Sequence, residues 1–313
     1  MVSSQPVIFD RICHRAHRSR AAALGPSTFL IDRVADDLCD RLAAVLRRFE
    51  FALDVGTPTD AVRRVLAASG KVGTIIAADA LTGTAAFRHL SDSRGKCEAQ
   101  FCIAADEEAL PLREASLDLV VSALALQFVN DLPGALIQIR RALRPDGLFL
   151  AALAGGETLT ELRQAFAAAE AEIEDGISPR VAPFSDVRDM GALLQRAGFA
   201  LPVTDVDRLT ARYDSPIALM HDLRRMGATN ALVERSRRPL KRATLTRMSE
   251  IYAERFADRD GRIRATFEIV WLCGWAPHES QQKPLAPGSA RQRLADVLGT
   301  TEIRLPRTGD GNQ

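Results

Sequence analysis

Short apolar runs alternate with segments of helical spacing along the middle of the chain. The first apolar run covers 51–55 and leads into Gly56, after which residues from about 60 to 68 have the apolar spacing of a helix. A buried strand, a tight glycine turn and a helix form the opening unit of a nucleotide-binding α/β sheet. Glycine suits such a turn because the backbone must reverse sharply and approach a ligand without a Cβ in the way.

Six further apolar runs continue this pattern and are predicted to be strands. They cover residues 72–78, 101–105, 116–122, 148–153, 202–213 and 265–272. Helices are expected before the first strand and between the later strands. They cover residues 29–49, 132–143, 157–174, 186–197, 216–226 and 239–257. Strands that alternate with helices require a mostly parallel sheet covered on both faces, so the predicted fold class is α/β, doubly wound.

Acidic residues stand in or just after the predicted strands, where a sheet of this kind binds its ligand. Asp79 closes the second strand, and an acid there can accept hydrogen bonds from both ribose hydroxyls of a nucleoside. Asp106 and Glu107 follow the third strand in the same way. Asp54 lies inside the first strand, so we expect it to be buried and to accept hydrogen bonds from backbone amides of the next loop.

This order of elements, with the sequence LRPDG at 143–147, resembles the class I S-adenosylmethionine-dependent methyltransferases over about residues 50 to 155. The resemblance implies a seven-stranded, Rossmann-like sheet whose last two strands are an antiparallel pair, with a helical insertion at about 214–260 between them. It also implies S-adenosyl-L-methionine as the cofactor. The residues expected to contact this cofactor are Asp54, Gly56, Asp79, Asp106, Glu107 and Ser122.

The same resemblance implies roles for individual residues of the site. Asp106 and Glu107 would face the adenine amino group, and Gln127 and Asn130, just past the fourth strand, would line the substrate pocket. Helix capping is the other interpretation of Asn130. Methyl transfer needs in-line positioning more than a fixed catalytic group, so no catalytic residue is assigned.

Five segments narrow the resemblance. They cover residues 9–11, 124–134, 155–163, 176–184 and 273–277. Together they resemble the methyltransferase-like assembly factors of respiratory complex I, over about residues 8 to 290. Members of that family are arginine hydroxylases that act on a complex I subunit despite their methyltransferase fold. The resemblance therefore implies modification of a protein side chain during complex I assembly.

The glycine turn departs from the pattern Asp-x-Gly-x-Gly-x-Gly of the methyltransferases. The corresponding residues here are Asp54, Gly56, Pro58 and Asp60. Pro58 removes a backbone N–H and fixes φ, while Asp60 would bring a carboxylate close to the methionine carboxylate of the cofactor. We therefore expect weakened cofactor binding. Two alternatives stay open: a small-molecule or acyl-carrier-protein carboxyl methyltransferase, and a non-catalytic assembly chaperone.

The charge pattern bears on partners. A net charge of +1 gives no overall attraction to nucleic acid or membrane. A local basic excess, interrupted by one acid, Glu234, consists of Arg224, Arg225, Arg235, Arg237, Arg238, Lys241, Arg242 and Arg247. We interpret this basic face either as a solvated helix surface or as a docking surface for a complex I subunit, another acidic protein or a membrane surface.

Metal binding and a membrane span are not expected. None of the five histidines stands in the His-x-Asp or His-x-Glu pair of a non-haem iron site, and no apolar run approaches about 18 residues. The arginine-rich start also suits a mitochondrial leader. Because the family resemblance begins at Phe9, we expect a bacterial cytoplasmic protein, or a mitochondrial matrix protein if the chain is eukaryotic.

The expected organisation has three parts. Residues 1–50 form an N-terminal helical cap, 51–275 form the methyltransferase-like domain, and 276–313 form a tail. The last dozen residues of the tail are expected to be poorly ordered.

Overall fold

A computed structural model describes residues 7–81, 99–174, 176–184, 186–282, 295–296 and 299–301. The chain divides into two compact units, Met1–Pro277 and His278–Gln313. All the helices and strands named below belong to the first unit. The prediction that the last dozen residues are poorly ordered concerns residues outside the described part of the chain.

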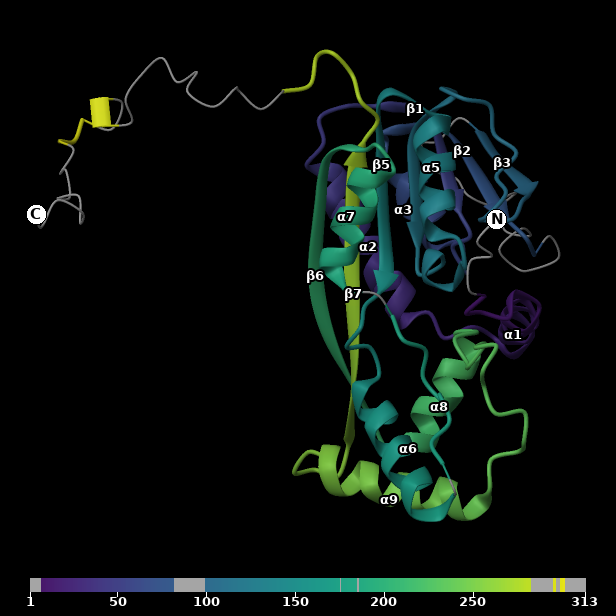
Figure 1. The fold of residues 1–313 in the computed structure, drawn as a ribbon. Coiled ribbons are helices and arrows are strands. Elements are labelled where there is room, and N and C mark those ends of the chain that lie inside the picture. Colours follow the sequence, from purple (N-terminus) through teal and green to yellow (C-terminus); the bar gives the residue numbers. More distant parts are fainter. Residues whose placement is uncertain are drawn as a thin grey trace, which may run out of the picture. The chain divides into compact units, whose positions relative to one another are not determined.

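The strands form a single sheet in the order β3-β2-β1-β4-β5-β7-β6. Their bounds are β1 Phe49–Val55, β2 Val72–Asp79, β3 Ala99–Ala104, β4 Leu117–Ala123, β5 Leu143–Ala154, β6 Ala200–Tyr213 and β7 Ile263–Trp275. The first five pair in parallel, and β7 runs antiparallel to both β5 and β6 (Figure 1). This confirms the predicted fold class, including the antiparallel final pair.

Helices cover both faces of this sheet. α2 (Phe29–Ala43) and α3 (Ala61–Ser69) pack on one face, and α5 (Leu132–Ala142) and α7 (Val187–Arg196) pack on the other (Figure 1). Alternate residues of each strand pack into the cores on the two faces of the sheet, because successive side chains of a strand point to opposite faces. Ala52 belongs to the α2–α3 core, whereas its neighbour Leu53 belongs to the α5–α7 core. Sheet strands buried on both faces explain the continuous apolar runs of the sequence.

Three more helices extend the fold beyond the carboxyl ends of the parallel strands. α6 (Thr160–Ile173) follows β5, and α8 (Pro216–Arg225) and α9 (Arg242–Phe256) are inserted between β6 and β7 (Figure 1). Tyr252 of α9 is fully buried, and its hydroxyl donates to the carbonyl of Arg264 at 2.8 Å. The predicted helical insertion is therefore present and is packed on the extended ends of β6 and β7. Within the described residues, no helix is long and apolar enough to cross a membrane.

Helix α1 (Arg11–Leu24) lies within the N-terminal segment that was expected to form a helical cap, although no separate helix was predicted at these residues. It begins after Asp10, whose carboxylate accepts the Cys13 amide at 2.9 Å, as an N-cap residue does. α1 lies next to α8, and the residues before it are tied to the chain that follows α8 (Figure 1). The backbone of Phe9 bridges to Leu232, and the Asp10 amide donates to the carbonyl of Ala231 at 2.8 Å. These contacts hold α1 over the carboxyl ends of the parallel strands.

Candidate functional site

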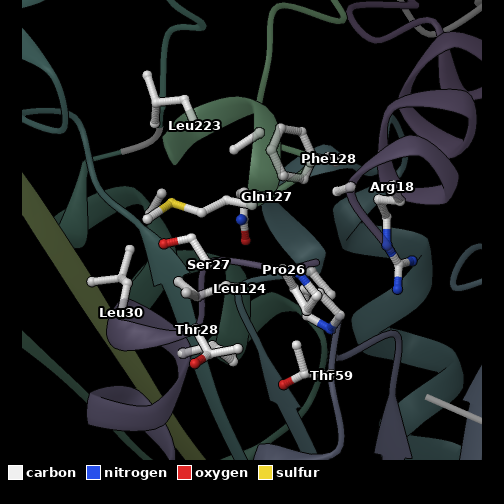
Figure 2. A pocket seen from close by; sticks show the side chains of 18 of the residues that line it. Arg18, Pro26, Ser27, Thr28, Leu30, Thr59, Leu124, Gln127, Phe128 and Leu223 are labelled. Atoms are coloured by element: carbon white, nitrogen blue, oxygen red, sulfur yellow. The ribbon is translucent and has the colours of Figure 1, made fainter. Parts of the chain in front are cut away.

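A cavity of about 520 Å³ opens at the carboxyl ends of β1 and β4. Its walls come from the turn after β1, from α1 and the start of α2, from the 3₁₀ turn η2 (Leu126–Phe128), and from the end of α8. Phe128, Phe184 and Phe267 give it an aromatic lining, and Figure 2 shows the ring of Phe128 at the cavity. A cavity of this size, mostly apolar with a few polar groups, is typical of a small-molecule or side-chain site.

Gly56 sets the shape of the turn at one end of this cavity. Its φ is +69°, and a Cβ at this position would lie 2.8 Å from Oε1 of Glu107 and 3.1 Å from the Cβ of Ala125. The positive φ and the crowding both require glycine. The glycine that the sequence singled out is therefore required by the shape of this turn, and its contact with a cofactor stays a prediction.

The two departures from the methyltransferase turn also face the cavity. Pro58 and Asp60 both line it. The Asp60 carboxylate lies 3.2 Å from Nε of Arg64, whose Nη2 lies 3.0 Å from Asp32. Asp60 precedes the first turn of α3 without capping it. An anionic side chain thus stands at a helix N-terminus that would otherwise attract a carboxylate.

Asp54 and Ser122 lie beneath the cavity and not in its wall. Asp54 is 1% exposed and accepts hydrogen bonds from the Thr57 hydroxyl and from Arg63, the latter at 3.4 Å. Both partners are side chains, whereas the sequence suggested backbone amides. Burial raises the pKa of Asp54 to about 6, against the opposing charge of Arg63. Ser122 donates to the carbonyl of Val55 at 2.8 Å, so its hydroxyl joins β4 to β1.

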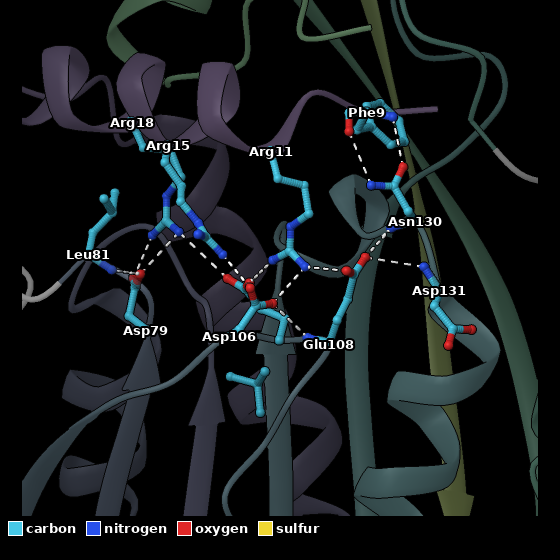
Figure 3. A network of polar contacts seen from close by, with 12 residues as sticks. Phe9, Arg11, Arg15, Arg18, Asp79, Leu81, Asp106, Glu108, Asn130 and Asp131 are labelled. Carbon is cyan, nitrogen blue, oxygen red and sulfur yellow. Dashed lines mark hydrogen bonds and ion pairs between the residues drawn. The ribbon is translucent and has the colours of Figure 1, made fainter. Parts of the chain in front are cut away.

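Asp79, the expected ribose ligand, is held by an arginine of α1. Nη1 and Nη2 of Arg18 lie 3.2 Å and 2.6 Å from Oδ1 and Oδ2 of Asp79 (Figure 3). The Leu81 amide also donates to Oδ1 at 2.9 Å. Asp79 is 3% exposed and Arg18 is 9% exposed, so this two-pronged ion pair is buried.

The acids after β3 are held by α1 as well. Nη1 of Arg11 lies 2.6 Å from Asp106 and 2.8 Å from Glu108, and its Nη2 contacts Glu107 (Figure 3). Arg15 contacts the second oxygen of Asp106. Burial raises the pKa of Asp106, but the Glu108 amide and the two guanidinium groups outweigh it, so this pKa lies below its usual range.

Sequence reasoning missed these three arginines as site residues. Arg11, Arg15 and Arg18 are spaced at i, i+4 and i+7, so they share one face of a helix. That spacing, next to the helix-capping Asp10, was the available signal.

Gln127 and His14 are two of the uncharged polar side chains that line the cavity. Oε1 of Gln127 is buried without a hydrogen-bond partner, and the side chain points into the cavity from η2 (Figure 2). His14 stacks on Phe128, with ring centroids 4.1 Å apart. Burial, with nearby Arg18, lowers the pKa of His14 to about 3, so the imidazole is neutral at physiological pH.

Asn130, the other expected pocket residue, is used elsewhere. Its Oδ1 accepts the amides of Ile8 and Phe9 at 2.9 Å and 2.8 Å, and its Nδ2 donates to the carbonyl of Phe9 at 3.1 Å (Figure 3). It is not one of the cavity-lining residues. It does not cap α5 either, because Asp131 accepts the Gly134 amide at 2.8 Å. Asn130 anchors the chain that leads into α1.

Half of the basic face is already neutralised or bonded within the chain. Arg235 pairs with Asp10 at 2.9 Å, Arg247 pairs with Glu172 at 2.6 Å, and Lys241 contacts Glu174. Arg225 donates to the carbonyl of Gly25. The exposed remainder consists of Arg224, Arg237, Arg238 and Arg242. In the part of the chain that the structure describes, no cluster of three or more His, Cys, Asp or Glu side chains is placed to hold a metal ion.

Comparisons with known proteins agree with this geometry. Residues 53–151 match the family model described as a methyltransferase domain, which supports S-adenosylmethionine as the cofactor. The chain is 38% identical over 293 residues to "Arginine-hydroxylase NDUFAF5, mitochondrial" of Danio rerio, covering 93% of this chain and 89% of the relative. It is 36% identical to "Malonyl-[acyl-carrier protein] O-methyltransferase" of Laribacter hongkongensis, covering 89% of this chain and 94% of that relative.

A solved structure supports the fold alone. The crystal structure of a putative methyltransferase from Bacillus halodurans superposes with a TM-score of 0.53 at 15% identity, covering 78% of this chain and all of that one. The comparisons confirm both levels of the resemblance that the sequence carried: the methyltransferase fold and the arginine-hydroxylase relatives.

Proposed function

Since the chain belongs to the methyltransferase-fold family of the NDUFAF5 arginine hydroxylases, we propose that it modifies an arginine side chain of a protein partner during assembly of respiratory complex I. S-adenosylmethionine would lie against Gly56 and Glu107 in the cavity wall and against Asp79 and Asp106, which pair with arginines of α1. The modified side chain would occupy the aromatic part of the cavity. When bound, this cofactor supplies a methyl group on a positively charged sulfur. The residues of the chain position the two reactants.

The observation that carries this proposal is the unpaired amide oxygen of Gln127. A buried acceptor without a donor costs on the order of 1–3 kcal/mol, so its presence in a cavity wall calls for a ligand that donates. A guanidinium group has five N–H donors and no acceptor. It also stacks on aromatic rings, and the cavity wall contains Phe128 and Phe184, which pack edge to face with ring centroids 6.5 Å apart.

The electrostatics of the part of the cavity next to α1 suit a cationic side chain. His14 is neutral at physiological pH, because its pKa is lowered to about 3. The arginines that approach the cavity from α1 are paired with carboxylates. A guanidinium group that enters therefore meets an acceptor and aromatic surface without an unpaired positive charge from α1.

The protein partner would dock beside the cavity. Arg237, Arg238 and Arg242 are exposed just beyond the segment that anchors α1, and they would attract an acidic surface of a complex I subunit. We place this reaction in the bacterial cytoplasm, or in the mitochondrial matrix if the chain is eukaryotic. The Danio rerio relative is named as mitochondrial.

The test uses cells that lack the chain and are supplied with a variant. Gln127→Leu removes the unpaired acceptor at similar volume, and Gln164→Leu on the exposed face of α6 is the matched control. The proposal expects mass spectrometry of complex I subunits to show a modified arginine with the wild type and the control, and loss of it with Gln127→Leu. An equal extent of modification with both variants would contradict the role of the cavity.

Carboxyl methylation of an acyl carrier is the second candidate. The 36% identity to the malonyl-carrier methyltransferase over 94% of its length favours it. So does Arg225, which lines the cavity and bonds a backbone carbonyl, not a carboxylate. Incubation of the purified chain with S-adenosylmethionine and either a malonyl carrier or an arginine peptide separates the two, since only the former would yield a base-labile methyl ester.

A further inference from the structure

The carboxylate expected to bind the ribose, that of Asp79, is largely occupied by donors from within the chain. A carboxylate offers about four lone-pair positions. Nη1 and Nη2 of Arg18 and the amide of Leu81 use three of them at Asp79, at 3.2, 2.6 and 2.9 Å. Two ribose hydroxyls cannot be accommodated beside these donors. The cofactor and Arg18 therefore require the same oxygen atoms.

The neighbouring acids are engaged by the same helix. Asp106 contacts Arg11 and Arg15, and Glu107 contacts Arg11 and lies 3.8 Å from Arg18 (Figure 3). Three guanidinium groups on one face of α1 thus pair with the acids that would recognise a nucleoside. These acids are Asp79, expected at the ribose, and Asp106 and Glu107, expected at the adenine. Four carboxylates, Glu108 included, lose their cationic partners when this face moves away.

From this coincidence we propose that α1 is an intramolecular competitor of the cofactor, with Arg18 standing on Asp79 where the ribose would bind. The proposal rests on the S-adenosylmethionine site of the proposed function. In the closed state the arginines neutralise the acids. In the open state α1 has withdrawn, and the uncovered carboxylates attract a cofactor that carries a net positive charge.

The attachments of α1 show where it is held. At its start, Asp10 pairs with Arg235, and the Phe9 backbone bridges to Leu232. At its end, the carbonyl of Gly25 accepts from Arg225. Arg225 is the last residue of α8, and Leu232 and Arg235 belong to the segment after α8 that leads into the exposed arginines of the basic face. A partner that docks on these exposed arginines would displace the same segment that holds the start of α1 in the closed state.

Calorimetric titration of the full chain with S-adenosylmethionine tests this competition. Arg18→Met keeps an apolar stem of similar length but cannot pair with Asp79, and the exposed Arg20→Ala on the same helix is the matched control. The expected result is at least tenfold tighter binding by Arg18→Met and an unchanged affinity for Arg20→Ala. Equal or weaker binding by Arg18→Met, or no binding by any variant, would overturn the proposal.

A second measurement does not depend on a folded variant. Hydrogen exchange of the wild-type chain with saturating S-adenosylmethionine should become faster at the amides of α1, because the helix no longer packs against Asp79 and Asp106. Unchanged or slower exchange there would overturn the competition. Neither measurement uses an acceptor substrate, so a failure to find a modified arginine in complex I does not affect these two results. Likewise, a failure of the competition does not affect the search for a modified arginine.

Discussion

Replacement of Gly56 by alanine isolates the contribution of the turn at the mouth of the cavity. An alanine with φ of +69° costs about 1–2 kcal/mol, because its Cβ crowds the following carbonyl. The new Cβ would also lie 2.8 Å from Oε1 and 3.0 Å from Cγ of Glu107. A free glutamate would swing away, but Glu107 is held by Arg11 and faces Arg18. Displacement of a buried, ion-paired carboxylate adds on the order of 1–2 kcal/mol.

The total for Gly56→Ala is therefore about 2–4 kcal/mol of lost unfolding free energy, from the strain and displacement values above. Chemical denaturation followed by circular dichroism measures it. Gly176→Ala is the matched control, since φ there is not positive and a Cβ would meet nothing within 4 Å. If Gly56→Ala is no less stable than Gly176→Ala, then Glu107 is not fixed as described and the turn tolerates a side chain.

Three further outcomes are expected. Pro58→Gly with Asp60→Gly restores a backbone donor and removes a negative charge from the cavity wall, which should tighten S-adenosylmethionine binding by about 2 kcal/mol or more, that is, over tenfold by calorimetry. The raised pKa of Asp54, about 6, means that the folded state binds its proton more tightly than the unfolded state. The stabilisation from this proton is therefore full below pH 4 and lost as the pH rises through about 6. As the pH falls from 7 to 4, the unfolding free energy of the wild type should rise relative to that of Asp54→Asn by up to about 3 kcal/mol. Arg237→Glu with Arg238→Glu should leave the melting temperature unchanged but reduce recovery of complex I subunits in a pull-down.

Each of these outcomes has a control. The double glycine variant is compared with Gly176→Ala, which lies away from the cavity wall. The pH comparison uses denaturation of both proteins in the same buffers, and parallel curves would refute the shifted pKa. The reversal on the basic face is matched by reversal of two exposed arginines of α7, Arg188 and Arg196. Equal recovery by both double variants at low and physiological salt would exclude charge-driven docking.

The sheet and the glycine turn could be predicted from the sequence because their signals are local. Strands buried on both faces appear as apolar runs, and Gly56 follows directly on the first of them. The position of Asp79 at the end of β2 was predicted by the same logic, and its contact with a ribose stays a prediction. Each of these inferences needs only a few neighbouring residues.

Helix α1 could not be found in this way. Its described buried residues are Arg18 and Ala21, so it has no apolar stripe to detect. The arginine spacing becomes meaningful only next to Asp79 and Asp106, which lie 61 and 91 residues further along the chain from Arg18 and Arg15 respectively. The sequence also does not show that Gln127 faces the cavity and Asn130 does not, because the 3₁₀ turn decides which of the two amides points there. Pairings of this kind depend on the assembled fold.

The most direct measurement of the central claim is a mass spectrum of complex I subunits from cells with and without this chain. The account predicts one arginine-containing peptide that is heavier by one oxygen atom or one methylene group only when the chain is present. Identical arginine peptides from both cells would contradict the claim that this cavity modifies a protein side chain.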